Sequence, residues 1–153
     1  MKLFYILFFL LSLTTPAFAQ ESPIDSGDTA WLLVSALLVL MMTVPGLALF
    51  YGGLVKRDNV LATLMQSLAV CVVVSVIWPV IGYSLAFSEG NGFVGGMGKF
   101  MLNGVTPESA VGTIPETVFI VFQMTFAVIT VALLVGAVAD RIKFSSLLAF
   151  IPL

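Results

Sequence analysis

Three long apolar segments without a charged residue constrain the fold of this chain more than any other feature. They cover residues 31–54, 61–87 and 118–139. A helix needs about 20 consecutive apolar residues to cross roughly 30 Å of hydrocarbon, so each segment is long enough to span a membrane. Charged residues make up only 9% of the 153 residues, against about a quarter in a typical soluble domain. We therefore predict an all-α polytopic membrane protein, with a lipid bilayer as its solvent.

A fourth apolar segment covers residues 144–153, where the sequence ends. This segment is too short to cross the hydrocarbon core as a helix. It is either peripheral to the membrane or the start of a truncated fourth span. We favour the second interpretation, in which the chain is the amino-terminal fragment of a longer membrane protein.

The amino terminus has the order of a secretory signal peptide. Lys2 is followed by an apolar core over residues 3–13 and then by Ala17-Phe18-Ala19. A basic start, an apolar core and a small-x-small end are typical of a signal peptide, and the core is too short for a first transmembrane helix. We predict a signal peptide over residues 1–19 and an external, acidic lead-in over residues 20–29.

The charges of the loops predict the orientation in the membrane. Lys56 and Arg57 lie between the first two spans, Arg141 and Lys143 follow the third, and Lys99 is the only basic residue in the intervening loop. Loops rich in lysine and arginine remain in the cytoplasm. The mature amino terminus and the middle loop are therefore expected outside a plasma (bacterial inner) membrane. Acidic residues are concentrated on that outer side: Glu21, Asp25, Asp28, Glu89, Glu108 and Glu116.

Composition also excludes several classes of function. The chain has no histidine, and the predicted spans contain no acid or base. Proton-transfer or protease chemistry in a membrane would need such groups, so we expect no enzyme, no metal site and no cofactor. The net charge of −2 provides no basic surface for nucleic acid. Cys71 lies in an apolar segment and is expected to be a small buried hydrophobe.

Two stripes of side chains recur at helical spacing within the spans. In the third span the spacing is i, i+4, i+7 and i+11, and in the first it is i, i+3 and i+4, so each stripe shares one helix face. From spacing alone, facing lipid or packing against other helices is the more common outcome, and lining a passage is the alternative. The residues are Phe122, Phe126, Ile129 and Leu133 in the third span and Leu47, Phe50 and Tyr51 in the first.

If the third-span stripe lines a passage, its chemistry suits ammonium. Two aromatic rings attract a small cation by roughly 0.5–2 kcal/mol. A bare cation cannot follow an apolar path inward, because burying an unpaired charge is very costly. Ammonium can lose its proton and cross as a neutral molecule, whereas potassium and sodium cannot.

Three motifs in order resemble the ammonium transporter family (Amt/Mep/Rh), nearest to its bacterial Amt branch. They are PGLALFYGGLVKRDNVL at residues 45–61, WPVIGYSLAFSEGN at 78–91 and FQMTFAVITVALLVGAVADRIKFSS at 122–146. The resemblance makes residues 30–153 a partial transporter domain: three spans and the start of a fourth in an eleven-helix, inverted-repeat fold. It also implies a homotrimer, ammonium and methylammonium as substrates, and a cytoplasmic regulatory protein as a partner.

The resemblance assigns roles to individual positions. Phe126 matches the outer-gate phenylalanine that recruits the cation, and Phe122 lies on the same outer wall. Leu47, Phe50 and Tyr51 match apolar pore-lining positions, and Ile129 and Leu133 continue the third-span stripe inward. The family's gate tryptophan, an aspartate and two pore histidines have no counterpart in this sequence, so the chain alone is expected to be inactive.

Two other functions remain open at this stage. One is an ammonium sensor, in which a transporter-like domain is joined to a signalling module. The other is a small structural membrane protein that serves as an anchor or assembly subunit. The residues that follow Leu153 in the gene would separate these alternatives from a transporter.

Overall fold

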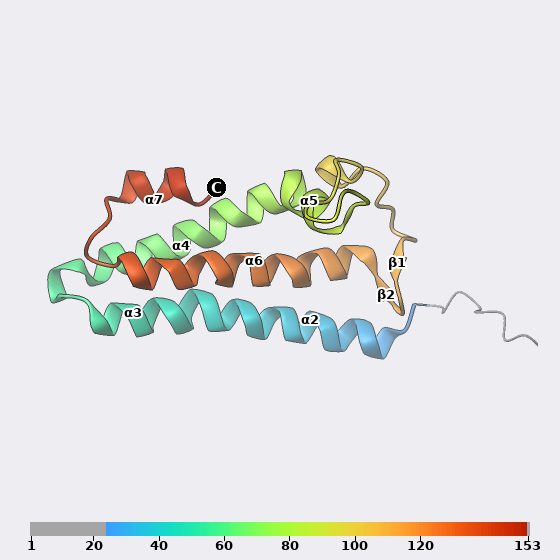
Figure 1. Cartoon of the computed structure of the whole chain (residues 1–153). Helices are drawn as coiled ribbons and strands as arrows, with labels where there is room; N and C mark the ends of the chain where they lie inside the picture. Colours follow the sequence, from blue (N-terminus) through green and yellow to red (C-terminus); the bar gives the residue numbers. More distant parts are fainter. Residues whose placement is uncertain (1–23, 153) are drawn as a thin grey trace, which may run out of the picture.

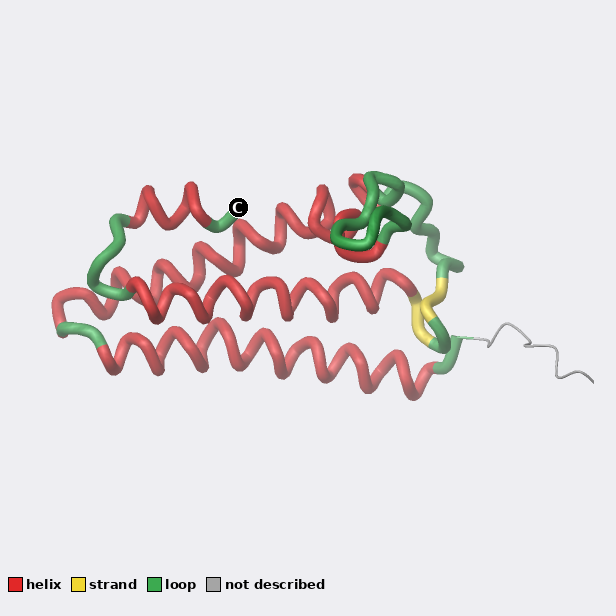
Figure 2. Tube along the Cα trace, viewed as in Figure 1, coloured by secondary structure: helices red, strands yellow, loops and turns green. Residues whose placement is uncertain are grey.

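The computed structural model describes residues 24–152. The predicted signal peptide, residues 1–19, and the first part of the lead-in lie outside the described residues. Three helical segments are long and apolar enough to cross a membrane: Ser26–Leu54, Arg57–Phe87 and Glu116–Val138. They run alternately back and forth along one axis (Figures 1 and 2). The prediction of a helical, multi-pass membrane protein is confirmed.

The first span combines α2 (Ser26–Met41), a π-helical turn η1 (Met42–Leu47) and α3 (Ala48–Leu54). It begins before the apolar residues because the Asp25 carboxylate caps it, accepting a hydrogen bond from the Asp28 backbone N–H at 2.8 Å. Pro45 lies inside η1. A proline has no N–H to donate, and the wider turn accommodates that missing bond without ending the helix.

The second span has the same composite form. It contains a short 3-10 turn η2 (Arg57–Asn59), α4 (Val60–Ile77), a second π-helical turn η3 (Trp78–Gly82) and α5 (Tyr83–Phe87). The Trp78 indole N–H donates to the Ile120 carbonyl oxygen at 3.1 Å. This bond fixes the carboxyl-terminal part of the second span against the third.

The third span is the single helix α6 (Glu116–Val138), which lies between α2 and α4 (Figure 1). One face of α6 is buried. It forms the core with side chains from α4, from α7 (Phe144–Phe150), which folds back along the bundle, and from the residue just after α7. The core residues are Val70, Val74, Val128, Ala132, Val135, Leu147 and Ile151.

A long loop joins the second and third spans at one end of the bundle. We call this end the outer end, and the opposite end the inner end, after the orientation that the loop charges predict. It contains a 3-10 turn η4 (Phe100–Leu102) and a small antiparallel hairpin of β1 (Ala110–Val111) and β2 (Ile114–Pro115), in which Ala110 pairs with Pro115. The hairpin contacts the start of α2, since the Asp25 N–H donates to the Thr113 carbonyl oxygen at 2.8 Å. The loop is thus attached to the start of the first span.

Gly95 provides a test of how tightly this loop is packed. A Cβ atom at Gly95 would lie 2.6–2.8 Å from the carbonyl oxygens of Ser84, Leu85 and Ser88. These carbonyl groups cannot move aside without distorting the backbone. Gly95→Ala is therefore expected to lower the free energy of unfolding by about 1–3 kcal/mol. A Cβ at Gly92 would meet nothing within 4 Å, which makes Gly92→Ala the matched control. Thermal unfolding in detergent would show this difference, and equal melting temperatures would contradict the packing.

Candidate functional site

The two aromatic residues of the third-span stripe form a pair on α6. The ring centroids of Phe122 and Phe126 are 5.0 Å apart with an interplanar angle of 83°. This edge-to-face arrangement is favourable because the ring edge is positive and the ring face negative. Phe126 is 40% exposed and Phe122 is half-buried. The pair therefore presents aromatic surface away from the core.

The other two stripe residues continue the same face toward the opposite end of α6. Ile129 is half-buried, and Leu133 is 53% exposed. The buried residues of α6 point instead toward α2 and α4: they include Ile120, Thr125, Val128, Ala132 and Val135. The structure thus keeps the four predicted residues on one face of α6, on which Phe126 and Leu133 are exposed and the other two are half-buried.

The first-span residues are divided between two environments. Leu47 packs against the hydrophobic core, whereas Phe50 is 60% exposed. The rings of Phe50 and Tyr51 are 5.5 Å apart, and the Tyr51 hydroxyl donates to the Leu133 carbonyl oxygen at 3.3 Å. The structure therefore brings Tyr51 to the inner end of the α6 stripe. Leu47 does not join the stripe and packs against the hydrophobic core instead.

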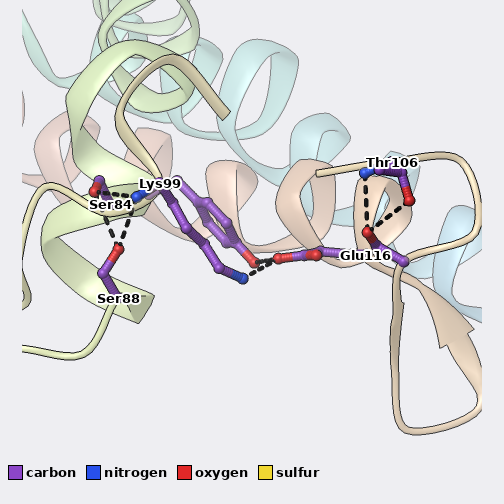
Figure 3. A network of polar contacts seen from close by, with 7 residues as sticks. Ser84, Ser88, Lys99, Thr106 and Glu116 are labelled. Carbon is purple, nitrogen blue, oxygen red and sulfur yellow. Dashed lines mark hydrogen bonds and ion pairs between the residues drawn. The ribbon is translucent and has the colours of Figure 1, made fainter. Parts of the chain in front are cut away.

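Sequence reasoning missed a polar network at the outer end, drawn in Figure 3. Glu116, the first residue of α6, is only 6% exposed. Its carboxylate accepts a hydrogen bond from the Tyr83 hydroxyl at 2.7 Å and forms an ion pair with Lys99. The Lys99 ammonium also lies 5.3 Å from the centroid of the Tyr83 ring. A carboxylate at this position further gains from the positive end of the helix dipole.

The same network attaches the outer loop to the second span. The Lys99 backbone N–H is shared between the hydroxyl oxygens of Ser84 at 3.0 Å and Ser88 at 3.1 Å. The Ser84 hydroxyl donates in turn to the Gly96 carbonyl oxygen at 2.8 Å. One signal was visible in the sequence: Lys99 is the only base in an acidic loop. The sequence does not show which acid it meets.

A second polar contact, at the opposite end of the bundle, joins the turn after the first span to the turn after the third. Asp140 has a φ of +63°, in the left-handed region, and it follows the end of α6. Its carboxylate accepts a hydrogen bond from the Asn59 side-chain amide at 2.6 Å. The turn between the first two spans is thereby held against the end of the third.

No group of three histidine, cysteine or acidic residues that could hold a metal ion occurs within residues 24–152. The site consists of an exposed aromatic pair on an apolar face of α6.

Comparison with known proteins relates this arrangement to a family. The family model described as "Ammonium Transporter Family" matches residues 30–153. A protein of Methanothermobacter thermautotrophicus is 50% identical over 133 residues, covering 85% of this chain and 33% of the relative. The ammonium transporter of Bacillus subtilis is 49% identical over 126 residues, covering 81% of this chain and 31% of that protein. The chain spans about a third of the length of these curated relatives.

The fold agrees with solved structures. The crystal structure of Candida albicans Mep2 superposes with a TM-score of 0.74 and 30% sequence identity, over 84% of this chain and 28% of that one. The three membrane-capable helices therefore have the fold of part of the Mep2 structure, as the predicted helical fold requires. The chain belongs to the ammonium transporter family.

Proposed function

We propose that this protein takes part in moving ammonium across a membrane, and that Phe126 and Phe122 recruit the cation at the outer mouth. The observation that carries the proposal is the edge-to-face pair of Phe122 and Phe126 on an apolar face of α6, in which the Phe126 residue is 40% exposed. We take ammonium as the substrate because relatives of this chain are named ammonium transporters. Methylammonium, a slightly larger cation with the same chemistry, is a second substrate.

The apolar path below the pair supplies the selectivity. Ile129 and Leu133 continue the stripe inward, and Phe50 and Tyr51 border its inner end. Leu47 supports these two residues from the core. A charged ion pays a large desolvation cost along such a path. Ammonium avoids this cost by giving up its proton to water at the outer mouth and crossing as ammonia, which takes up a proton from water on the inner side. Potassium has no proton to give up and is rejected.

The arrangement of the loops supports the proposed orientation. The turn that bears Lys56 and Arg57 lies at the same end of the bundle as the turn that bears Arg141 and Lys143, opposite the outer loop with Lys99 (Figure 1). The concentration of positive charge makes the first end cytoplasmic. We accordingly place the protein in the plasma (inner) membrane with its mature amino terminus outside. Likeness to the family supports two further proposals, a homotrimer and a cytoplasmic regulatory partner.

Uptake of methylammonium tests the proposed function. The complete native reading frame would be expressed in cells that lack their own ammonium uptake. We expect saturable entry of labelled methylammonium that ammonium inhibits and an equal concentration of potassium does not. A membrane-inserted protein that binds ammonium without uptake would instead favour a sensor. A protein that does neither would contradict the proposal.

A further inference from the structure

Gly136 occupies the next position of the α6 stripe. It follows Leu133 by three residues, and residues three or four apart lie on one face of a helix. The stripe thus continues from large apolar side chains to a residue that has none. Within a helix a glycine costs roughly 1 kcal/mol relative to alanine, so its presence at this place calls for a packing reason.

The ring of Tyr51 fills the space above Gly136. A Cβ atom at Gly136 would lie 2.4 Å from both Cε1 and Cζ of Tyr51 and 2.8 Å from its hydroxyl oxygen. Separations this short do not occur between real atoms. Small residues permit such close approach between helices in a membrane. The ring therefore reaches the α6 backbone only because residue 136 is glycine.

The Tyr51 ring is held at this place by two contacts. Its hydroxyl donates to the Leu133 carbonyl oxygen at 3.3 Å, and its centroid lies 5.5 Å from that of the Phe50 ring. The atoms that would clash are two carbons of a rigid plane, not the end of a flexible chain. A methyl group at residue 136 must therefore lift the whole ring off α6.

The direction of that movement follows from exposure. The side chains of Leu133 and Phe50 beside the ring are both largely exposed, so the open space lies on the stripe side. A ring lifted off α6 moves into that space. If the stripe lines the proposed path, the displaced ring narrows the inner end of the path.

We infer that Gly136 is a positioning residue for Tyr51: by letting its ring lie against the α6 backbone, Gly136 sets the width of the inner end of the ammonium path. The inference rests on the proposed function. It makes Gly136 a determinant of substrate size, because a narrower end obstructs methylammonium more than ammonium. The residue acts through Tyr51 and does not itself contact the substrate.

The test compares two substrates in the complete protein. Initial uptake of nitrogen-labelled ammonium and carbon-labelled methylammonium would be measured for wild type and for Gly136→Ala. We expect the methylammonium-to-ammonium ratio to fall about fivefold or more, within the range that one strained core contact produces. Gly53→Ala is the matched control, because a Cβ there would meet nothing within 4 Å, and its ratio should equal that of wild type.

A double variant guards against a folding defect. Gly136→Ala/Tyr51→Leu removes the clashing ring, and it should recover the membrane abundance and substrate ratio of Tyr51→Leu alone. An unchanged ratio in Gly136→Ala, or no recovery in the double variant, would overturn the inference. Absence of uptake by wild type would instead contradict the proposed function itself, so the two failures are distinguishable.

Discussion

Phe126→Ala is expected to raise the concentration of ammonium needed for half-maximal uptake about tenfold, equivalent to loss of one good cation–π contact. The ring of Phe126 is the exposed member of the edge-to-face pair, and the Phe122 ring supports it at 5.0 Å. Its removal leaves a half-buried ring that a cation reaches less well. Discrimination against potassium should fall at the same time. Competition against labelled methylammonium uptake measures both effects.

Two further variants make this result specific to the aromatic pair. Phe126→Tyr retains a ring and should retain most of the affinity. Phe93→Ala removes a phenylalanine that is 98% exposed in the outer loop, and it should change neither affinity nor selectivity. If Phe126→Ala behaves like Phe93→Ala, the recruitment role of the pair is wrong.

Lys99→Ala is expected to destabilise the outer end of the bundle. It removes the cation that pairs with the buried Glu116 carboxylate, which then retains only the Tyr83 hydroxyl. Breaking a buried ion pair on one side costs about 3–5 kcal/mol. Lys99 is partly exposed, so solvent screening lowers the expected loss to about 2–3 kcal/mol. Thermal unfolding in detergent would show it as a clearly lower melting temperature.

The control for this prediction separates charge pairing from loss of a lysine. Lys143 is exposed and makes no side-chain ion pair within the described residues, so Lys143→Ala should leave the melting temperature nearly unchanged. The variant Lys99→Met/Glu116→Gln removes both charges and should be milder than Lys99→Ala. Equal melting of Lys99→Ala and Lys143→Ala would contradict the ion pair.

The spans could be predicted because their signal is local. A long apolar segment without charge indicates a transmembrane helix whatever its neighbours are, and all three predicted segments form helices. Their starts were predicted late because polar caps belong to the helix. Asp25 caps α2 from within the acidic lead-in, and the buried Glu116 begins α6. In both cases the polar residue was attributed to a loop.

The rest of the site depends on contacts between distant residues. The stripe on α6 is helical geometry and was predictable, but its partner Tyr51 comes from α3. Nothing in the local sequence of Gly136 indicates that a ring from another helix lies on it. The same holds for Lys99, Tyr83 and Glu116, which three separate segments bring together.

Flux through the purified protein in liposomes tests the central claim most directly. The complete protein would be reconstituted with internal dyes for pH and for potassium and exposed to equal gradients of ammonium and of potassium. Movement of ammonium through an aromatic gate and an apolar path predicts a rapid internal pH change with ammonium, well above that of protein-free liposomes, and no ion flux with potassium. A rate equal to that of protein-free liposomes, or equal passage of potassium, would contradict the account.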